Sequence, residues 1–263
     1  MFKQILLITD GCSNVGIQPA IAASQARELG ITVNVIGIVD DGAIGEYGAA
    51  EISEIAKMGG GMSRIVNQRQ LSQTVQMLTR KTVVQTIHQA VNQELRHILG
   101  REGGSTQLED LPPTDRSEVV RVMDEMSEST ALRIALLIDA SASMKPKLAA
   151  VEEAIRDLMI SLQSRQGMSE VSVFHFPGAH GDEPVVMDVG WVQDMSKVRK
   201  LFSRLQMRGT TPTGPALLHV IDYYQYDSNI VERAREDEQS SPLMIHAQHE
   251  GTGTGGMWSD YIV

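Results

Sequence analysis

The residues best suited to chemistry in this sequence are Asp139, Ser141 and Ser143, which alternate in the stretch Asp-Ala-Ser-Ala-Ser. They follow the apolar run Arg133–Ile138, which predicts a buried strand. Open α/β sheets bind ligands at the carboxyl ends of their strands, so these three oxygens can turn towards one point. Such donors suit Mg²⁺ or Mn²⁺, not zinc. The same residues can also cap the following helix, so this stretch alone leaves a metal site and a helix cap open.

Two further stretches offer matching oxygen donors. Thr211 lies in the turn Gly209–Gly214, which opens a helix and presents several hydroxyl groups. Asp10 ends the apolar run Lys3–Thr9 and is followed by a glycine, so it supplies a second carboxylate at the end of a strand.

Three weaker signals each have a simpler explanation. The glycines of Gly251–Gly256 fit a dinucleotide-binding pattern, but the seven residues after them are too few for the helix that would hold the pyrophosphate. His246 and His249 have ligand-like spacing, but they lie in the same polar tail, which favours no metal role for them. Cys12 has no histidine close in sequence to activate it, which favours a passive thiol.

Alternating strands and helices are expected to position these residues. The expected strands are Lys3–Thr9, Ile31–Val39, Ser63–Val66, Arg133–Ile138, Glu170–Phe176 and Pro184–Val189. The expected helices begin at Pro19 and Leu71 or span Ala49–Lys57, Asp115–Glu128, Pro146–Leu162, Met195–Leu205 and Gly214–Tyr226. Apolar strands separated by helices predict an α/β fold, with a doubly wound, Rossmann-like, mostly parallel sheet flanked by helices.

Composition excludes several classes of partner. The 263 residues carry 23 Lys plus Arg and 33 Asp plus Glu, a net charge of −10, which repels nucleic acids and anionic lipid surfaces. A single cysteine rules out an intrachain disulfide and disfavours a cysteine-based zinc site. We find neither a signal peptide nor a run of roughly 18 apolar residues, so we expect a cytoplasmic protein without a membrane span.

The three oxygen-bearing stretches together resemble the metal-ion-dependent adhesion site (MIDAS) of the von Willebrand factor A (VWA) family. That site combines a D-x-S-x-S motif, a threonine in a glycine-bounded turn and an aspartate in a T-D-G strand end. The flanking segments RIALLIDASASM, ILLITDG and AKMGGGMSRIV resemble the family as well. Carried over residue by residue, the resemblance implies a metal site formed by Asp139, Ser141, Ser143, Thr211 and Asp10.

The order of the motifs differs from that of the family. A VWA domain begins with D-x-S-x-S and reaches T-D-G later, whereas here residues 1–99 resemble the last half of the fold and residues 131–226 the first half. We therefore interpret the chain as a circularly permuted VWA fold. Residues 100–130 are then a linker with an acidic helix, and residues 227–263 a flexible tail. This layout resembles VWA proteins of spore-forming bacilli, which suggests a link to sporulation.

The resemblance implies protein recognition, not catalysis. In the family, serine and threonine hydroxyls contact the ion directly, aspartates often act through water, and one position stays open for an acidic side chain. We therefore expect a Mg²⁺ or Mn²⁺ cofactor, a protein partner that presents a carboxylate, and no catalytic residue. The strand ending at Asp10 should lie beside the strand ending at Asp139, so that both carboxylates face one cleft.

Other functions stay open. A Mg²⁺-dependent phosphohydrolase would use the same ion, but the nearby cations Lys145 and Lys147 are expected on the helix side. His175 is expected as a packed or edge residue of a strand, not as a general base. A scaffold with a vestigial metal site is the third possibility. The chain is either a monomer or a swapped dimer in which 1–99 of one copy completes 131–226 of another.

Overall fold

The computed structural model describes residues 1–39, 45–99, 108–178, 183–194 and 209–240. The strands in these ranges are β1 (Phe2–Thr9), β2 (Ile31–Val39), β3 (Gly60–Asn67), β4 (Leu132–Asp139), β5 (Ser169–Phe176) and β6 (Val186–Val192). The α-helices are α1 (Pro19–Glu28), α2 (Glu46–Met58), α3 (Leu71–Leu99), α4 (Pro113–Ser129), α5 (Leu148–Gln163) and α6 (Thr213–Ser240). Short 3-10 helices are η1 (Gln68–Gln70), η3 (Leu108–Asp110) and η4 (Ala142–Lys147).

The strands form one sheet in the order β3-β2-β1-β4-β5-β6. Neighbouring strands are parallel except at the edge, where β6 runs antiparallel to β5. The predicted doubly wound, mostly parallel α/β fold is therefore confirmed. The winding direction reverses between β1 and β4, and in such sheets this switch point is where ligands bind. The strands can be renumbered so that β4, β5 and β6 come first and β1, β2 and β3 follow. The order read from the β6 edge is then again 3-2-1-4-5-6.

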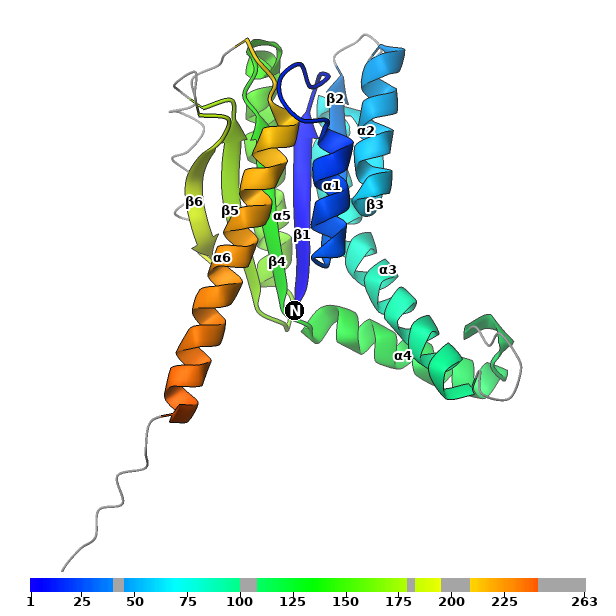
Figure 1. Cartoon of the computed structure of the whole chain (residues 1–263). Coiled ribbons are helices and arrows are strands. Elements are labelled where there is room, and N and C mark those ends of the chain that lie inside the picture. Colours follow the sequence, from blue (N-terminus) through cyan, green and yellow to red (C-terminus); the bar gives the residue numbers. More distant parts are fainter. Residues whose placement is uncertain (40–44, 100–107, 179–182, 195–208, 241–263) are drawn as a thin grey trace, which may run out of the picture. The chain divides into compact units, whose positions relative to one another are not determined.

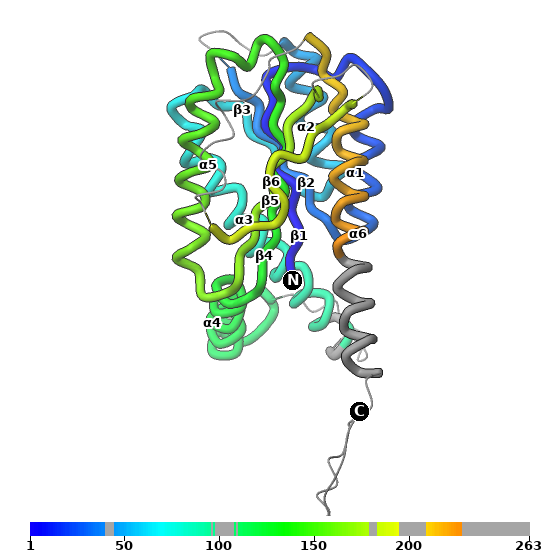
Figure 2. Tube along the Cα trace, turned by 90° about the vertical axis from the view of Figure 1, so that its left-hand side faces the viewer, coloured from blue at the N-terminus to red at the C-terminus, as the bar shows by residue number. Residues whose placement is uncertain are grey.

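Helices cover both faces of the sheet. One face packs against α1, α2 and α6, and the other against α3 and α5 (Figure 1). Figure 2 shows the sheet between α5 on one side and α1 and α6 on the other. Successive residues of β1 enter opposite cores, Leu6 and Ile8 in one, Ile5 and Leu7 in the other. Strands buried on both faces explain the near-continuous apolar runs in the sequence.

Several expected boundaries shift. The helix expected from Pro146 begins at Leu148, because Pro146 lies inside η4. The helix expected to end near Tyr226 continues to Ser240. The expected helix Met195–Leu205 lies outside the described residues, as do residues 241–263 of the predicted tail.

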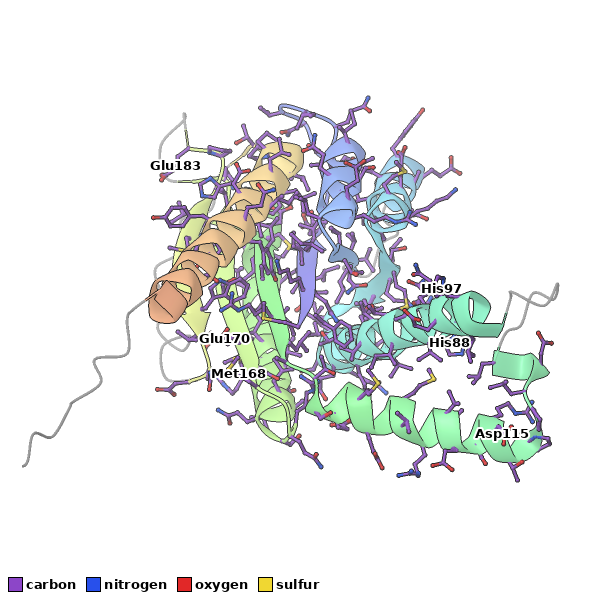
Figure 3. The ribbon with its side chains drawn as sticks, turned by 60° about the horizontal axis from the view of Figure 1, so that its bottom comes forward. His88, His97, Asp115, Met168, Glu170 and Glu183 are labelled. Atoms are coloured by element: carbon purple, nitrogen blue, oxygen red, sulfur yellow. The ribbon has the colours of Figure 1, made fainter. Side chains whose placement is uncertain are left out.

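Contacts divide the chain into the units Met1–Tyr224 and Gln225–Val263. The sheet belongs to the first unit, and residues 1–99 and 131–226 contribute three strands each. Helices α3 and α4 contact each other, and Figure 3 shows His88 and His97 on α3 and Asp115 on α4. Within the described ranges, none of the helices has the length and apolar content needed to cross a bilayer.

A buried tyrosine ties α6 to the central strands. The Tyr224 hydroxyl donates to the backbone carbonyl of Gln4 in β1 at 2.7 Å and accepts from the Ala135 N–H in β4 at 3.1 Å. Burial raises the pKa of Tyr224, so the hydroxyl stays protonated and able to donate. The phenol thus satisfies backbone groups on both strands of the pair at the switch point.

Replacing this hydroxyl tests its role. We expect Tyr224→Phe to lower the free energy of unfolding by about 1–3 kcal/mol, because buried backbone groups lose their partner. Urea unfolding followed by circular dichroism measures the loss. The matched control is Tyr226→Phe, since Tyr226 is 67% exposed and should tolerate the change. Equal stability of the two variants would contradict the structural role of Tyr224.

Candidate metal centre

The candidate site lies where β1 and β4 end side by side. Asp139 is the last residue of β4, and Asp10 directly follows β1. The parallel register pairs Ile8 with Ile138, so the two carboxyl ends are level. The prediction that the Asp10 and Asp139 strands are neighbours is confirmed.

Asp139 is fully buried and held by two hydrogen bonds. The Thr9 hydroxyl donates to Oδ2 at 2.6 Å, and the Ser141 N–H donates to Oδ1 at 2.7 Å. Burial raises the pKa of the Asp139 carboxyl, and these hydrogen bonds offset only part of that effect. A cation near this carboxyl would therefore stabilise its charged form.

Two serines connect Asp139 to Asp10. The Ser141 and Ser143 hydroxyl oxygens lie 3.1 Å apart, and Ser143 Oγ donates to Asp10 Oδ1 at 2.8 Å. Ser141 is buried at the start of η4, whereas Ser143 is exposed. The structure thus joins four of the five predicted site residues in one hydrogen-bonded row that crosses from β4 to β1.

Thr211, the fifth predicted residue, is held through its backbone by the loop that follows Asp10. Its N–H donates to Asn14 Oδ1 at 2.8 Å, and its carbonyl accepts from Asn14 N and Ser13 Oγ, both at 3.2 Å. The Glu51 carboxylate accepts from the Ser13 N–H at 3.0 Å. The start of α6 is therefore fixed on the loop after Asp10. Asn14 was not among the predicted residues, and only its position in that loop could have indicated it.

Lys147 is the main correction to the sequence analysis, which placed it on the helix side. Its Nζ donates to Asp10 Oδ2 at 2.5 Å and to the Ser143 carbonyl at 3.3 Å. The Lys147 and Asp10 side chains are only 6% and 3% exposed. The reason is local: residues 142–147 form a 3-10 helix before α5 begins, so Lys147 belongs to the loop around the site.

The other reactive side chains lie outside this row. His175 in β5 is packed, as expected, with Nδ1 2.7 Å from Asp188 Oδ2 in β6. Desolvation, followed by the neighbouring Glu51 carboxylate, raises the pKa of the Cys12 thiol, which disfavours a thiolate nucleophile. His246, His249 and Gly251–Gly256 lie outside the described residues.

The donor set fits a hard divalent cation. All side-chain donors in the row are oxygens, two from carboxylates and the others from hydroxyls, which suits Mg²⁺ or Mn²⁺. Within the described ranges, no group of three or more His, Cys, Asp or Glu side chains could hold a metal. A metal at this position would therefore depend on the serine and threonine hydroxyls.

The fold and site define an α/β protein with a doubly wound sheet and an oxygen-rich centre at its switch point. No protein-family model matches the chain. The uncharacterized protein YabS of Bacillus subtilis (strain 168) is 46% identical over 215 residues, which cover 82% of this chain and 86% of YabS. The chain therefore belongs to the YabS family.

A solved structure resembles this chain over most of its length. The crystal structure of an uncharacterized protein from Alicyclobacillus acidocaldarius subsp. acidocaldarius DSM 446 is 43% identical with a TM-score of 0.80, over 88% of this chain and 96% of that one. Proximal thread matrix protein 1 from the mussel byssus, with a zinc-occupied MIDAS motif, is 14% identical over 80% of this chain and 43% of that one. Its TM-score of 0.24 is too low to show a shared fold.

The contact between Lys147 and Asp10 gives a stability prediction. Without divalent ions, we expect Lys147→Met and Asp10→Asn each to lower the free energy of unfolding by about 3–5 kcal/mol, because each leaves a buried charge unpaired. The double variant should lose clearly less than the sum of the two. Urea unfolding in EDTA measures the coupling.

The exposed pair of Arg121 and Glu125 provides the control. The same cycle there, Arg121→Met with Glu125→Gln, should give a coupling of about 1 kcal/mol or less. Additive losses at Lys147 and Asp10 would show that the two side chains do not form a pair in solution.

Proposed function

We propose that the chain is a metal-dependent protein-binding module of the VWA type, with a MIDAS-like centre formed by Asp139, Ser141, Ser143, Thr211 and Asp10. The observation that carries this proposal is the hydrogen-bonded row that links the ends of β4 and β1. Its oxygens come from two distant parts of the chain and converge at the switch point, where α/β sheets bind ligands.

The side chains of the proposed site differ in burial, and their roles differ accordingly. Thr9 and Ser141 orient the buried Asp139 carboxylate. Ser143 is exposed, so its hydroxyl faces the side from which a partner approaches. A bound Mg²⁺ or Mn²⁺ would supply an electrophilic position for a carboxylate oxygen of the partner. The Lys147 ammonium adds positive charge beside Asp10, which also favours an acidic partner.

The proposed circular permutation is supported by the order of the motifs. The D-x-S-x-S motif at Asp139 follows T-D-G at Asp10, the reverse of the order in the VWA family. The sheet accommodates either chain order, because its strand order is the same whether counted from β1 or from β4. In the permuted reading, the segment between α3 and β4, which contains α4, joins the original ends.

A Mg²⁺-dependent phosphohydrolase is the second candidate, and the position of Lys147 favours it. An ammonium beside the Asp10 carboxylate is a group that phosphoryl transfer can use. We prefer binding because a hydrolase also needs a base for water. In the described part of the chain, His175 is engaged by Asp188 and the site row contains no histidine.

Metal binding is the first test. We expect Mn²⁺ and Mg²⁺ to bind with one site per chain in calorimetric titrations of the full-length protein. Ser143→Ala should weaken that affinity at least about tenfold, roughly 1.4 kcal/mol, through loss of a hydroxyl ligand. Ser117→Ala is the matched control, because Ser117 is exposed on α4 and its hydroxyl donates to the Thr114 carbonyl, away from the site. Absence of binding at millimolar metal would favour the scaffold with a vestigial site.

Partner capture is the second test. The immobilised chain should retain a protein from cell extract with Mg²⁺ and release it with EDTA, and Ser141→Ala combined with Ser143→Ala should abolish retention. The partner's binding should in turn depend on one of its Asp or Glu side chains, since a carboxylate fills the open position. Steady Mg²⁺-dependent phosphate release from p-nitrophenyl phosphate, lost in Asp139→Asn, would instead favour the hydrolase.

A further inference from the structure

A polar pocket of about 540 Å³ opens at the other end of the sheet from the candidate metal centre. It is bordered by the first residues of β2 and β3, by the ends of α1 and α2, and by one face of α3. Figure 3 looks onto this end of the molecule and shows His88 on the same stretch of α3. The volume of the pocket falls within the range of small-molecule sites, roughly 300–1,000 Å³.

Two cations converge on this pocket without a carboxylate. Arg27 comes from the last turn of α1 and Lys57 from the last turn of α2. None of the lining residues is Asp or Glu, and no ion pair joins either cation to another described residue. The carboxyl-terminal ends of α1 and α2 carry partial negative charge, which offsets part of the positive charge of Arg27 and Lys57. On a chain of net charge −10, two such cations in one pocket still form a local positive centre.

The consecutive residues Gly59, Gly60 and Gly61 line the pocket and form a wall of bare backbone. At Gly61 a Cβ would lie 2.2 Å from the Val33 carbonyl oxygen, and Gly60 has a φ of +68°. Neither position therefore tolerates a side chain without strain. A Cβ at Gly60 would lie 3.4 Å from Arg27 Nε, so the guanidinium stem runs along this wall.

The face of α3 that borders the pocket is polar at helical spacing. Thr82, Gln85 and Gln89 follow one another at steps of three and four, which places them on one face. The Thr82 hydroxyl donates to Asn34 Oδ1 at 3.0 Å. Among the described residues, the buried Asn34 amide nitrogen finds no hydrogen-bond partner. Gln85 and Gln89 are exposed, so their amide groups can donate to a ligand.

We propose that this pocket binds a small, hydroxyl-bearing molecule with a phosphate group. Arg27 and Lys57 hold the phosphate, because guanidinium and ammonium groups are the side chains suited to phosphate oxygens. The amides and hydroxyls of the α3 face suit a polar body, since apolar side chains contribute little to the lining. The proposal is independent of the metal centre, which lies at the carboxyl ends of the strands.

The test uses the full-length chain in EDTA at constant ionic strength, so that no metal contributes. Isothermal titration with inorganic phosphate and with ribose 5-phosphate should show one site per chain, with ribose 5-phosphate binding more tightly. Arg27→Gln combined with Lys57→Gln should weaken both affinities at least about tenfold. Gln89→Ala should weaken ribose 5-phosphate binding and leave phosphate binding within about twofold.

The matched control removes the same charge elsewhere. Arg69→Gln combined with Lys145→Gln changes two exposed cations outside the pocket, and both affinities should stay within about twofold. Circular dichroism confirms that all variants fold. No measurable binding of either ligand would overturn the proposal. Equal weakening by the pocket and control variants would also overturn it, because it would show general attraction to positive charge.

Discussion

The parallel pairing of β1 with β4 is the constraint on which the rest of the structure depends. Both strands carry apolar side chains into both cores, and burying each large aliphatic side chain contributes roughly 1.5–3 kcal/mol. A slip of one residue would exchange the faces of every side chain, so packing fixes the register. That register makes the two strand ends level and brings Asp10 and Asp139, separated by more than a hundred residues, to one place.

The electrostatics of the site follow from this convergence. Two carboxylates at neighbouring strand ends repel each other, and burial of Asp139 adds to the cost of their charges. The structure compensates with hydroxyl and N–H donors around Asp139 and with the Lys147 ammonium on Asp10. The proposed divalent ion would draw on the same Asp10 carboxylate as Lys147. The affinity for the divalent ion would then depend on how readily the ion and the Lys147 ammonium share the Asp10 carboxylate.

Much of the fold could be predicted because its signals are local. Apolar runs ending in Asp10 and Asp139 predicted both strands and the positions of their carboxyl ends. Lys147 was misplaced because a 3-10 helix replaces the first turn of the expected α-helix, and charge pattern does not reveal that change. The continuation of α6 to Ser240 lacks an apolar stripe, although its Glu, Arg and Gln residues favour helix. The residues that line the polar pocket around Arg27 and Lys57 come from five separate elements, so no single sequence motif could indicate it.

Crystals of the full-length chain grown with Mn²⁺ provide the most direct test of the proposed metal centre between β1 and β4. Anomalous scattering should place one manganese between the ends of β1 and β4, with Ser141 and Ser143 oxygens at coordination distance, about 2.2 Å. The Lys147 ammonium should then have moved from its position on Asp10 or should share that carboxylate with the ion. A manganese peak elsewhere, or none at saturating Mn²⁺ with the hydrogen-bonded row intact, would contradict the account.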